Sequence, residues 1–200
     1  MPTDAWMEKA FICVTQQGGS DIEFSILVDS IKDTKPKEEV DQQVLVNGGR
    51  VVVFKPSDMG EITIKGFPTD VGTTTSTTTA TGFDDMMGAG MAASAQPISV
   101  VPDFNRYKYR VVIAFTDDTA VTKATNACTS GKRMVRFKRA NCYVTSIEND
   151  EFTAENPLKK TITFKYAAFD KSADKNFTDE STDGSGTLGA VSAYTSTTKW

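Results

Sequence analysis

The sequence predicts a mainly β protein, and three observations carry this prediction. Apolar and polar residues alternate along several short runs, Val, Ile, Phe, Tyr and Thr are frequent, and Gly pairs separate neighbouring runs. A chain of 200 residues can bury a sizeable core without disulfides. We expect one β domain over residues 1–170, followed by an extended or disordered C-terminal arm over residues 171–200.

Five strands are predicted in the first third of the chain. They cover residues 9–15, 21–29, 42–47, 50–55 and 61–67. Gly18-Gly19 lies between the first two strands and Gly48-Gly49 between the next two, so we expect each pair to form a hairpin.

A long segment without strand patterning follows, over residues 68–97. Its first half is low-complexity Thr and its second half is rich in Gly, Ala and Met. We expect a long loop that is functional or becomes ordered against a partner, with at most one short helix at residues 84–95.

The second half of the chain returns to strand patterns. Residues 104–118 are the longest strong β run, and residues 158–170 alternate Ile, Phe and Tyr with Thr and Lys. Between them, residues 132–150 are expected to hold two strands joined near Ala140-Asn141. After Asp170 the apolar alternation that a packed element needs is missing.

The composition excludes several functional classes. The chain has no histidine, which excludes Ser-His-Asp and Cys-His catalysis and His-ligated metal sites. A net charge of −4 argues against a protein whose function is to bind nucleic acid. Cys13, Cys128 and Cys142 show no metal-binding spacing and are expected to be reduced apolar fillers, with a single Cys128–Cys142 bridge as an alternative that nothing in the sequence supports. We therefore expect no enzyme activity, no cofactor, no metal and no membrane span.

Basic residues gather at two places. Arg106, Lys108 and Arg110 fall on one strand face, with Tyr107 and Tyr109 on the other. Such a face suits single-stranded nucleic acid or a charged contact between subunits, and the acidic total favours the contact. The second cluster comprises Lys132, Arg133, Arg136, Lys138 and Arg139, which nearby acids such as Glu148, Asp150, Glu151 and Glu155 are expected to offset.

Three acidic patterns are interpreted as ordinary surface features. Asp84-Asp85 and Asp117-Asp118 are adjacent in sequence, which is typical of turns rather than of a catalytic carboxylate pair. Residues 170–176 space oxygen side chains as a calcium loop does, but Lys175 replaces the required Gly.

Two stretches carry a resemblance to a known family. They are GRVVVFKPSDMGEITIKGFPTDVG (residues 49–72) and FKRANCYVTSIENDEFTAENPLKKTITFKYAAFDKSADKNFTDES (residues 137–181). In patterning and turn placement the chain resembles major tail tube proteins of tailed viruses of bacteria and archaea. The resemblance implies a β-sandwich or barrel-like core, subunits in hexameric rings, and sheets that complete a β-barrel lumen for DNA ejection. Such proteins usually carry a helix against the core, for which this sequence offers only residues 84–95.

The resemblance also implies where subunits meet and what they meet. Partners would be copies of this chain, the terminator, the tape measure and the baseplate or initiator, with DNA passing through unbound. The location would be the virion tail, assembled in the host cytoplasm. Candidate inter-subunit residues are Thr73, Thr74, Thr75, Thr77, Thr78, Thr79, Arg106, Lys108 and Arg110. Deletion of residues 73–81 is expected to abolish ring stacking and to spare the monomer fold.

Three rival interpretations remain open at this point, and one of them is an enzyme that uses carboxylates alone, which the missing histidine does not exclude although nothing points to a site. Another virion β-sandwich, such as a capsid decoration or tail-terminator protein, would show the same lack of catalytic motifs. A carbohydrate- or ligand-binding module would need exposed aromatic residues, and Trp6 and Trp200 lie near the termini.

Overall fold

A computed structural model gives the structure of the chain over residues 9–17, 21–23, 26–55, 57–68, 108–150, 159–171 and 174–194. Within these ranges the regular elements are strands, and no helix is present. This confirms the prediction of a mainly β fold. The predicted loop at residues 68–97 and the helix at residues 84–95 lie outside the described residues, apart from Pro68 at the end of a strand.

The strands, in chain order, are β1 (Lys9–Gln16), β2 (Asp21–Glu23), β3 (Ile26–Thr34), β4 (Val40–Val44), β5 (Arg50–Phe54), β6 (Gly60–Pro68), β7 (Tyr109–Thr116), β8 (Met134–Asn149), β9 (Lys160–Tyr166), β10 (Phe169–Lys171), β11 (Asp174–Lys175) and β12 (Phe177–Thr182).

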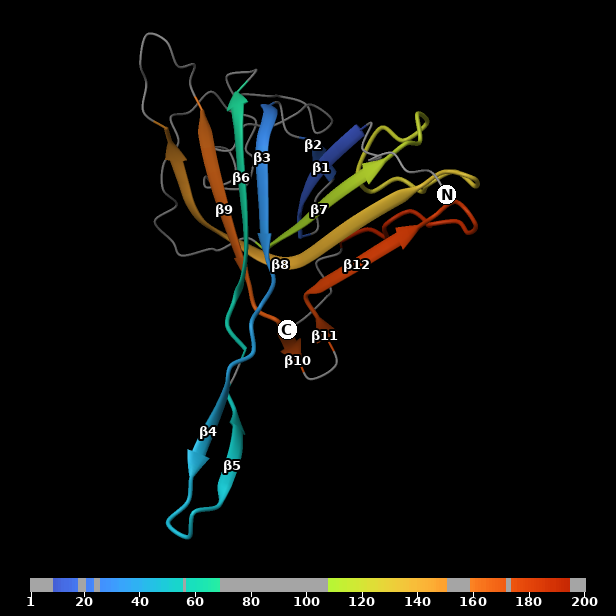
Figure 1. Ribbon diagram of the computed structural model, residues 1–200. Helices are drawn as coiled ribbons and strands as arrows, with labels where there is room; N and C mark the ends of the chain where they lie inside the picture. Colours follow the sequence, from blue (N-terminus) through green and yellow to red (C-terminus); the bar gives the residue numbers. More distant parts are fainter. Residues whose placement is uncertain are drawn as a thin grey trace.

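Eight of these strands form one sheet that curls into a half-barrel (Figure 1). The order across the sheet is β2-β1-β7-β8-β9-β6-β3, and β12 pairs with β8 beside this path. The pairings are antiparallel. Two further hairpins, β4-β5 and β10-β11, stand apart from the sheet.

The main core lies on the face of the sheet to which the inward residues of β1, β6, β7 and β9 point. Its fully or nearly fully buried members include Val14, Ile62, Ile64, Tyr109, Val111, Ile162, Phe164 and Tyr166. The rings of Tyr109 and Phe164 meet edge to face, with centroids 6.2 Å apart. Alternation along these strands therefore puts every second residue in the core, as the sequence predicts.

A second apolar cluster lies on the other face of β1 and β7. Cys13, Val112 and Ala114 pack with Val121 and Ala124 of the connection between β7 and β8. Two residues of the C-terminal segment, Leu188 and Val191, pack against this cluster. All three cysteines are free and buried, as expected from the sequence.

The segment of residues 132–150 differs from its prediction. It forms one strand, β8, of 16 residues instead of two. Asn141 has a φ of 56°, so the strand bends near the position where the sequence suggested a break. Residues before the bend pair with β7 and β12, Cys142 just after it still pairs with Tyr109 of β7, and the residues from Tyr143 onward pair with β9. The bend lets one strand serve both halves of the curled sheet.

The predicted strand at residues 21–29 is also divided. Residues 21–23 pair with β1, which confirms the first hairpin, but β3 starts at Ile26 and pairs with β6 instead. This pairing continues to Thr34, beyond the predicted end. The alternation of apolar and polar residues could not indicate that the chain changes its partner from β1 to β6, because a strand that pairs with either neighbour shows the same two-residue period.

The chain after Asp170 contains an ordered strand where we expected no packed element. β12 pairs with β8 over six residues from Phe177–Arg139 to Thr182–Met134. Its exposed residues are polar, charged side chains reinforce the backbone pairing with β8, and Phe177 alone packs against the main core. Apolar periodicity could not reveal a strand that is held in this way.

Candidate assembly surface

The hairpin of β4 and β5 projects away from the curled sheet (Figure 1). Its strands pair from Val40–Phe54 to Val44–Arg50, which confirms the predicted second hairpin. At the tip, Gly48 has a φ of 79°, and Asn47 accepts a 3.0 Å hydrogen bond from the Gly49 amide. Gly at position 48 suits this left-handed conformation. We call β4, β5 and the turn between them the projecting hairpin.

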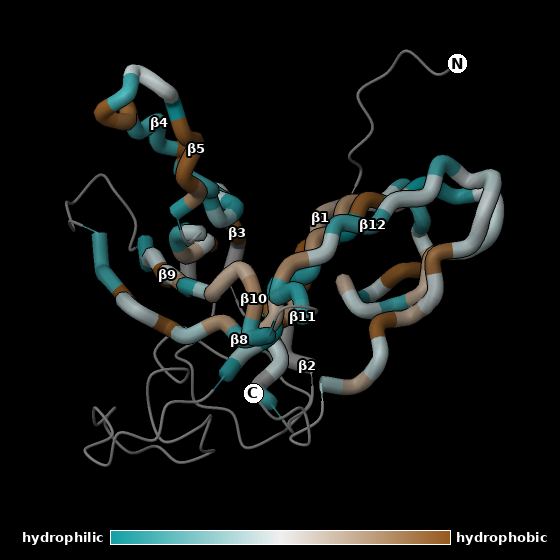
Figure 2. Tube along the Cα trace, turned by 90° about the horizontal axis from the view of Figure 1, so that it is seen from below, coloured by the Kyte–Doolittle hydropathy of each residue, from teal (hydrophilic) through white to brown (hydrophobic). Residues whose placement is uncertain are grey.

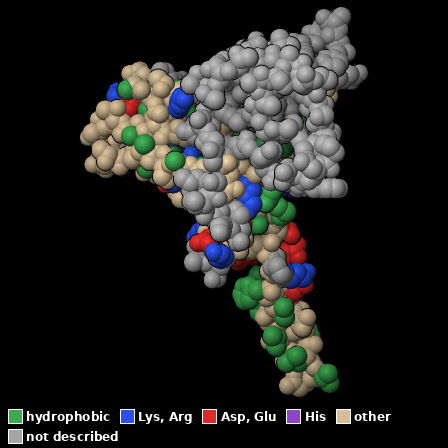
Figure 3. Space-filling view, turned by 180° about the vertical axis from the view of Figure 1, so that it is seen from behind, with side chains coloured by type: hydrophobic (Ala, Val, Ile, Leu, Met, Phe, Trp, Pro, Cys, Tyr) green, Lys and Arg blue, Asp and Glu red, His purple; other side chains and the backbone are tan. Residues whose placement is uncertain are grey.

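One face of the projecting hairpin is apolar. Cross-strand pairing and alternation bring Val40, Val44, Val52 and Phe54 to this face together with Gln42 and Arg50, whereas Val51 and Val53 fall on the opposite face. All four are exposed, Phe54 to 70%, and Val46 at the tip is exposed completely. Figure 2 shows hydrophobic colour along β5 and the tip, and Figure 3 shows hydrophobic side chains along the projecting part.

The opposite face is more polar near the sheet. Lys55 pairs with Glu39 at 3.1 Å and with Asp41 at 2.9 Å. These ion pairs raise the pKa of Lys55, chiefly through the hydrogen bond to Asp41. Most of the exposed apolar side chains of the two strands therefore lie on one face of the projecting hairpin, and this face lacks a covering layer among the described residues.

The exposed apolar face is unfavourable for an isolated subunit. A single two-stranded hairpin is marginally stable in water, and contiguous exposed apolar side chains mark contact sites. Full burial of a Val or Phe side chain contributes roughly 1.5–3 kcal/mol. Contact with another protein surface would thus stabilise both the projecting hairpin and the complex.

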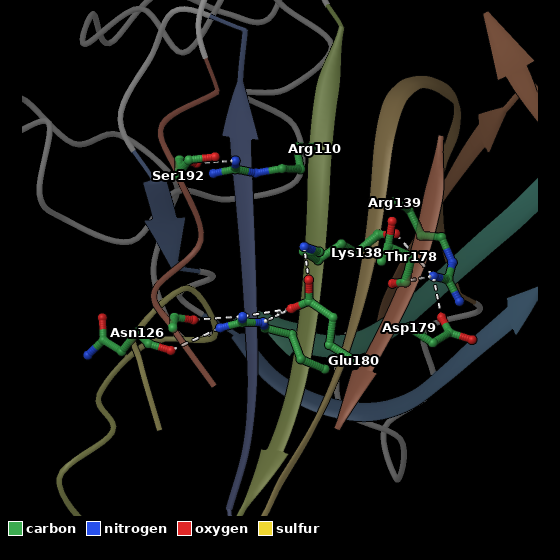
Figure 4. A network of polar contacts seen from close by, with 10 residues as sticks. Arg110, Asn126, Lys138, Arg139, Thr178, Asp179, Glu180 and Ser192 are labelled. Carbon is green, nitrogen blue, oxygen red and sulfur yellow. Dashed lines mark hydrogen bonds and ion pairs between the residues drawn. The ribbon is translucent and has the colours of Figure 1, made fainter. Parts of the chain in front are cut away.

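A network of ion pairs joins β8 to β12 (Figure 4). Arg136 donates to Glu180 at 2.7 and 3.0 Å, and Lys138 pairs with the other oxygen of the same carboxylate. Arg136 also donates to the carbonyl oxygens of Asn126 at 3.0 Å and Gly189 at 2.8 Å. The nearly buried Arg136 guanidinium is thereby surrounded by acceptors.

The acids that neutralise the second basic cluster differ from those expected. In the described residues, the partners are Asp33, Asp117, Asp179 and Glu180. Of the acids proposed from sequence, Asp150 pairs with Lys65, at 2.5 Å. Glu151 and Glu155 lie outside the described residues. The distant partners could not be identified before the fold was known.

The C-terminal segment, residues 183–194, covers one side of the sheet. The amide of Cys128 donates to the Leu188 carbonyl at 2.8 Å, and the Val191 amide donates to the Thr125 carbonyl at 2.9 Å. Tyr194 is buried, and its hydroxyl donates to the Asn141 side chain at 2.6 Å. The segment is therefore fixed to the bend of β8.

The predicted cationic face on β7 lies partly under this segment. Arg110 is buried, donates to the Ser192 carbonyl at 2.5 Å and lies over the ring of Tyr194, 5.4 Å from its centroid. Burial lowers the pKa of Lys108, which is partly covered. Tyr109 points into the core on the other face, as predicted. Arg106 lies outside the described residues.

The Thr residues proposed for ring contacts, at positions 73–79, lie outside the described residues. So does Asp84-Asp85. Asp117 and Asp118 follow β7 in a turn, as predicted: Asp118 accepts hydrogen bonds from the amides of Ala120 and Thr129.

The segment compared with a calcium loop serves a structural role where it is described. Asp170 accepts hydrogen bonds from the side chains of Asn141, at 2.7 Å, and Asn176, at 3.1 Å. Within the described ranges, no three His, Cys, Asp or Glu side chains are grouped in a way that could hold a metal ion. Nor do these ranges include a helix with the length and apolar character of a membrane span.

A pocket of about 490 Å³ opens between β8, β11 and the C-terminal segment. Arg110, Lys138 and Lys175 line it together with Asp174. Arg110 and Lys138 are already engaged by Ser192 and Glu180. The charges in the pocket therefore do not indicate a particular ligand.

Sequence reasoning missed the exposure of the projecting hairpin. The run of three Val and one Phe at residues 51–54 is typical of a buried strand. A signal was nevertheless present, because charged residues and Pro flank both sides of the hairpin, at residues 35–39 and 55–58. Such flanks are typical of a strand pair that leaves the core.

The sequence matches no family model and no curated protein. Solved structures do match the fold. One is a chain in the structure of an extracellular contractile injection system, the PVC sheath/tube terminator in its extended state. Its TM-score to this chain is 0.50 and the sequence identity is 13%, and the match covers 90% of this chain and 99% of the other. Another is a chain of the anti-feeding prophage cap, described as a tube terminating cap. Its TM-score is 0.50 and the sequence identity is 14%, and the match covers 91% of this chain and 95% of the other. At these identities the likeness concerns the fold, which is related to tail tubes.

Proposed function

From this tube-related fold, we propose that the protein is a structural subunit of a viral tail tube. Copies of the chain would form rings, hexameric as the sequence resemblance implies, and the rings would stack into a conduit for DNA. Its further partners would be the terminator, the tape measure and the baseplate or initiator. The role is mechanical and requires no catalysis.

The observation that carries the proposal is the apolar face of the projecting hairpin. Val40, Val44, Val52 and Phe54 are exposed on an element that stands outside the sheet. In an assembly of identical subunits, every hairpin meets the same surface of a neighbour, so one apolar face is buried at each contact. A second copy of this chain is therefore the partner that we propose for the projecting hairpin.

The face of β6 and β9 opposite the core supports a conduit. It carries Thr63 and Thr163 as cross-strand partners, with Lys165 paired to Glu61 at 3.6 Å. Cations that are neutralised within the sheet attract phosphates weakly, and a weakly attractive wall lets DNA pass. We propose that this polar face lines the channel.

Two contact sites expected from the sequence remain part of the proposal. Thr73, Thr74, Thr75, Thr77, Thr78 and Thr79 would contact the next ring. Arg106 and Lys108 would contact an acidic surface of a neighbour, and Arg110 would support them from beneath the C-terminal segment.

A second candidate function is a terminating ring or cap. The two solved structures described above are named as a tube terminator and a tube terminating cap, and this observation favours it. A terminating subunit would form single rings, whereas a tube subunit would continue to stack. The two functions therefore differ in the length of the assembly.

Negative-stain electron microscopy with light scattering, across protein concentration and salt, tests the proposal. We expect hollow tubes from the full chain, and no tubes from a Val44→Ser/Phe54→Ser variant that retains the monomer fold. Gln43→Ser, on the opposite face of the same hairpin, is the matched control and should assemble normally. Single rings would favour the terminator, and normal tubes from the apolar-face variant would refute the proposed role of the hairpin.

A further inference from the structure

Two short connections join the projecting hairpin to the sheet. β3 ends at Thr34, and the chain runs through residues 35–39 before β4 begins. On the return side, residues 57–59 lead into β6. We call these two connections the root of the projecting hairpin.

Two backbone hydrogen bonds hold the root together. The Lys55 amide donates to the Glu39 carbonyl at 2.9 Å, and the Asp58 amide donates to the Lys37 carbonyl at 3.0 Å. These bonds join the outgoing strand to the returning strand. They do not connect either strand sideways to β8 or β12, so any such connection must come from side chains.

A sideways connection is provided by Arg139 of β8, whose side chain is completely buried. Its Nε and Nη2 donate to the two carboxylate oxygens of Asp33, one residue before β3 ends. Its Nη1 donates to Asp179 of β12 at 2.7 Å. A bidentate pair of this kind fixes both the position and the orientation of the carboxylate.

Asp179 extends the connection to the root itself. Its second oxygen pairs with Lys35, the first residue of the root. The four side chains thus alternate in charge, from Asp33 through Arg139 and Asp179 to Lys35, and they hold residues 33 and 35 against β8 and β12. We call this group the root clamp.

We propose that the root clamp fixes the angle at which the projecting hairpin leaves the sheet, with Arg139 and Asp179 as positioning residues. Only the consequence for assembly rests on the proposed function: a fixed angle would present the apolar face to a neighbouring subunit in one orientation. The clamp itself is a property of the single subunit.

The test measures the orientation of the hairpin in the monomer. Val46→Cys at the tip and Lys171→Cys on β10 are both at exposed positions, whereas the three native thiols are buried and should stay unlabelled. Pulsed electron paramagnetic resonance of spin labels on these two cysteines measures the distance between the tip of the projecting hairpin and β10. We expect a narrow distribution, which broadens and shifts when Lys35→Met and Asp179→Asn are combined.

Three variants make the result specific. Lys35→Arg keeps the cation and should preserve the narrow distribution. Lys159→Met breaks a comparable surface pair with Asp29, at 3.2 Å, away from the root, and should also leave it unchanged. Arg139→Met, if it folds, should broaden the distribution most. An unchanged distribution in the Lys35→Met/Asp179→Asn variant would overturn the clamp.

Assembly is then measured separately on the same variants. If the distribution broadens and tube formation weakens, both the clamp and the proposed contact are supported. If the distribution broadens while tubes form normally, the clamp stands but a fixed angle is not required for assembly, and the contact itself is judged by the Val44→Ser/Phe54→Ser variant. The two inferences can therefore fail independently.

Discussion

The guanidinium of Arg139 donates to both carboxylate oxygens of Asp33, which lies 106 positions earlier in the chain. This pair joins β8, at the centre of the sheet, to β3 at its edge. Because Arg139 is completely buried, its charge depends on Asp33 and Asp179 for compensation. The stability of the fold and the placement of the projecting hairpin therefore share one arginine.

Asp33→Asn should destabilise the monomer by roughly 1.5–3 kcal/mol, because it removes a charged hydrogen-bond acceptor from a buried guanidinium. Urea unfolding followed by fluorescence measures this change. Asp29→Asn is the matched control on the same strand: its partner Lys159 is partly exposed, so the change should stay below about 1 kcal/mol. Equal effects of the two substitutions would contradict the account.

Acid should weaken the attachment of β12. Burial raises the pKa of Asp179 and Glu180, but hydrogen bonds from basic groups, including Lys35 and Lys138, outweigh burial and leave both pKa values lowered. A lowered pKa in the folded state contributes stability above the unfolded value of about 4, and this contribution disappears as the pH falls through the folded value.

We therefore expect the free energy of unfolding to decrease as the pH falls below about 4. The decrease should be shallower in an Asp179→Asn/Glu180→Gln variant, which lacks both titrating groups. Urea unfolding at a series of pH values compares the two proteins. If the free energy of unfolding decreases equally steeply with falling pH in both proteins, these carboxylates do not contribute to the acid sensitivity.

Gly60→Ala should destabilise the fold by about 1–3 kcal/mol through overpacking. A Cβ at this position would lie 2.3 Å from the Tyr166 ring, which is completely buried and cannot move aside without a cost. Gly186→Ala, where the new methyl group meets no atom within 4 Å, is the control. Thermal unfolding of the two variants should separate them clearly, and similar melting temperatures would be inconsistent with the packing described.

The thiols should be inert in the native protein. Cys13, Cys128 and Cys142 are buried, and burial raises the pKa of Cys128 and of Cys142, so little reactive thiolate forms at neutral pH. A chromogenic disulfide reagent should react with all three thiols in denaturant and with none in buffer. Rapid reaction of a native thiol would contradict the burial described for that residue.

The strands of the core were predictable from the sequence because alternation is a local property. β1, β6, β7 and β9 all overlap predicted runs, and the turn at Gly48-Gly49 confirms the second hairpin. The bend at Asn141 also falls where a break was expected, although the strand continues through it.

The candidate site was less accessible to sequence reasoning. A run of Val and Phe has the same appearance in a buried strand and in an exposed contact, so the surface role of β5 depends on what packs against it. β12 was missed because ion pairs with Arg136 and Lys138, rather than apolar alternation, attach it to β8. Long-range charge pairs of this kind leave no local pattern.

Hydrogen–deuterium exchange of residues 40–54, before and after assembly, tests the central claim most directly. If a second copy covers the apolar face of the projecting hairpin, the amides of β4 and β5 should exchange rapidly in the monomer, become protected in tubes, and recover rapid exchange on dilution. Assemblies in which these amides exchange as fast as in the monomer would contradict the claim.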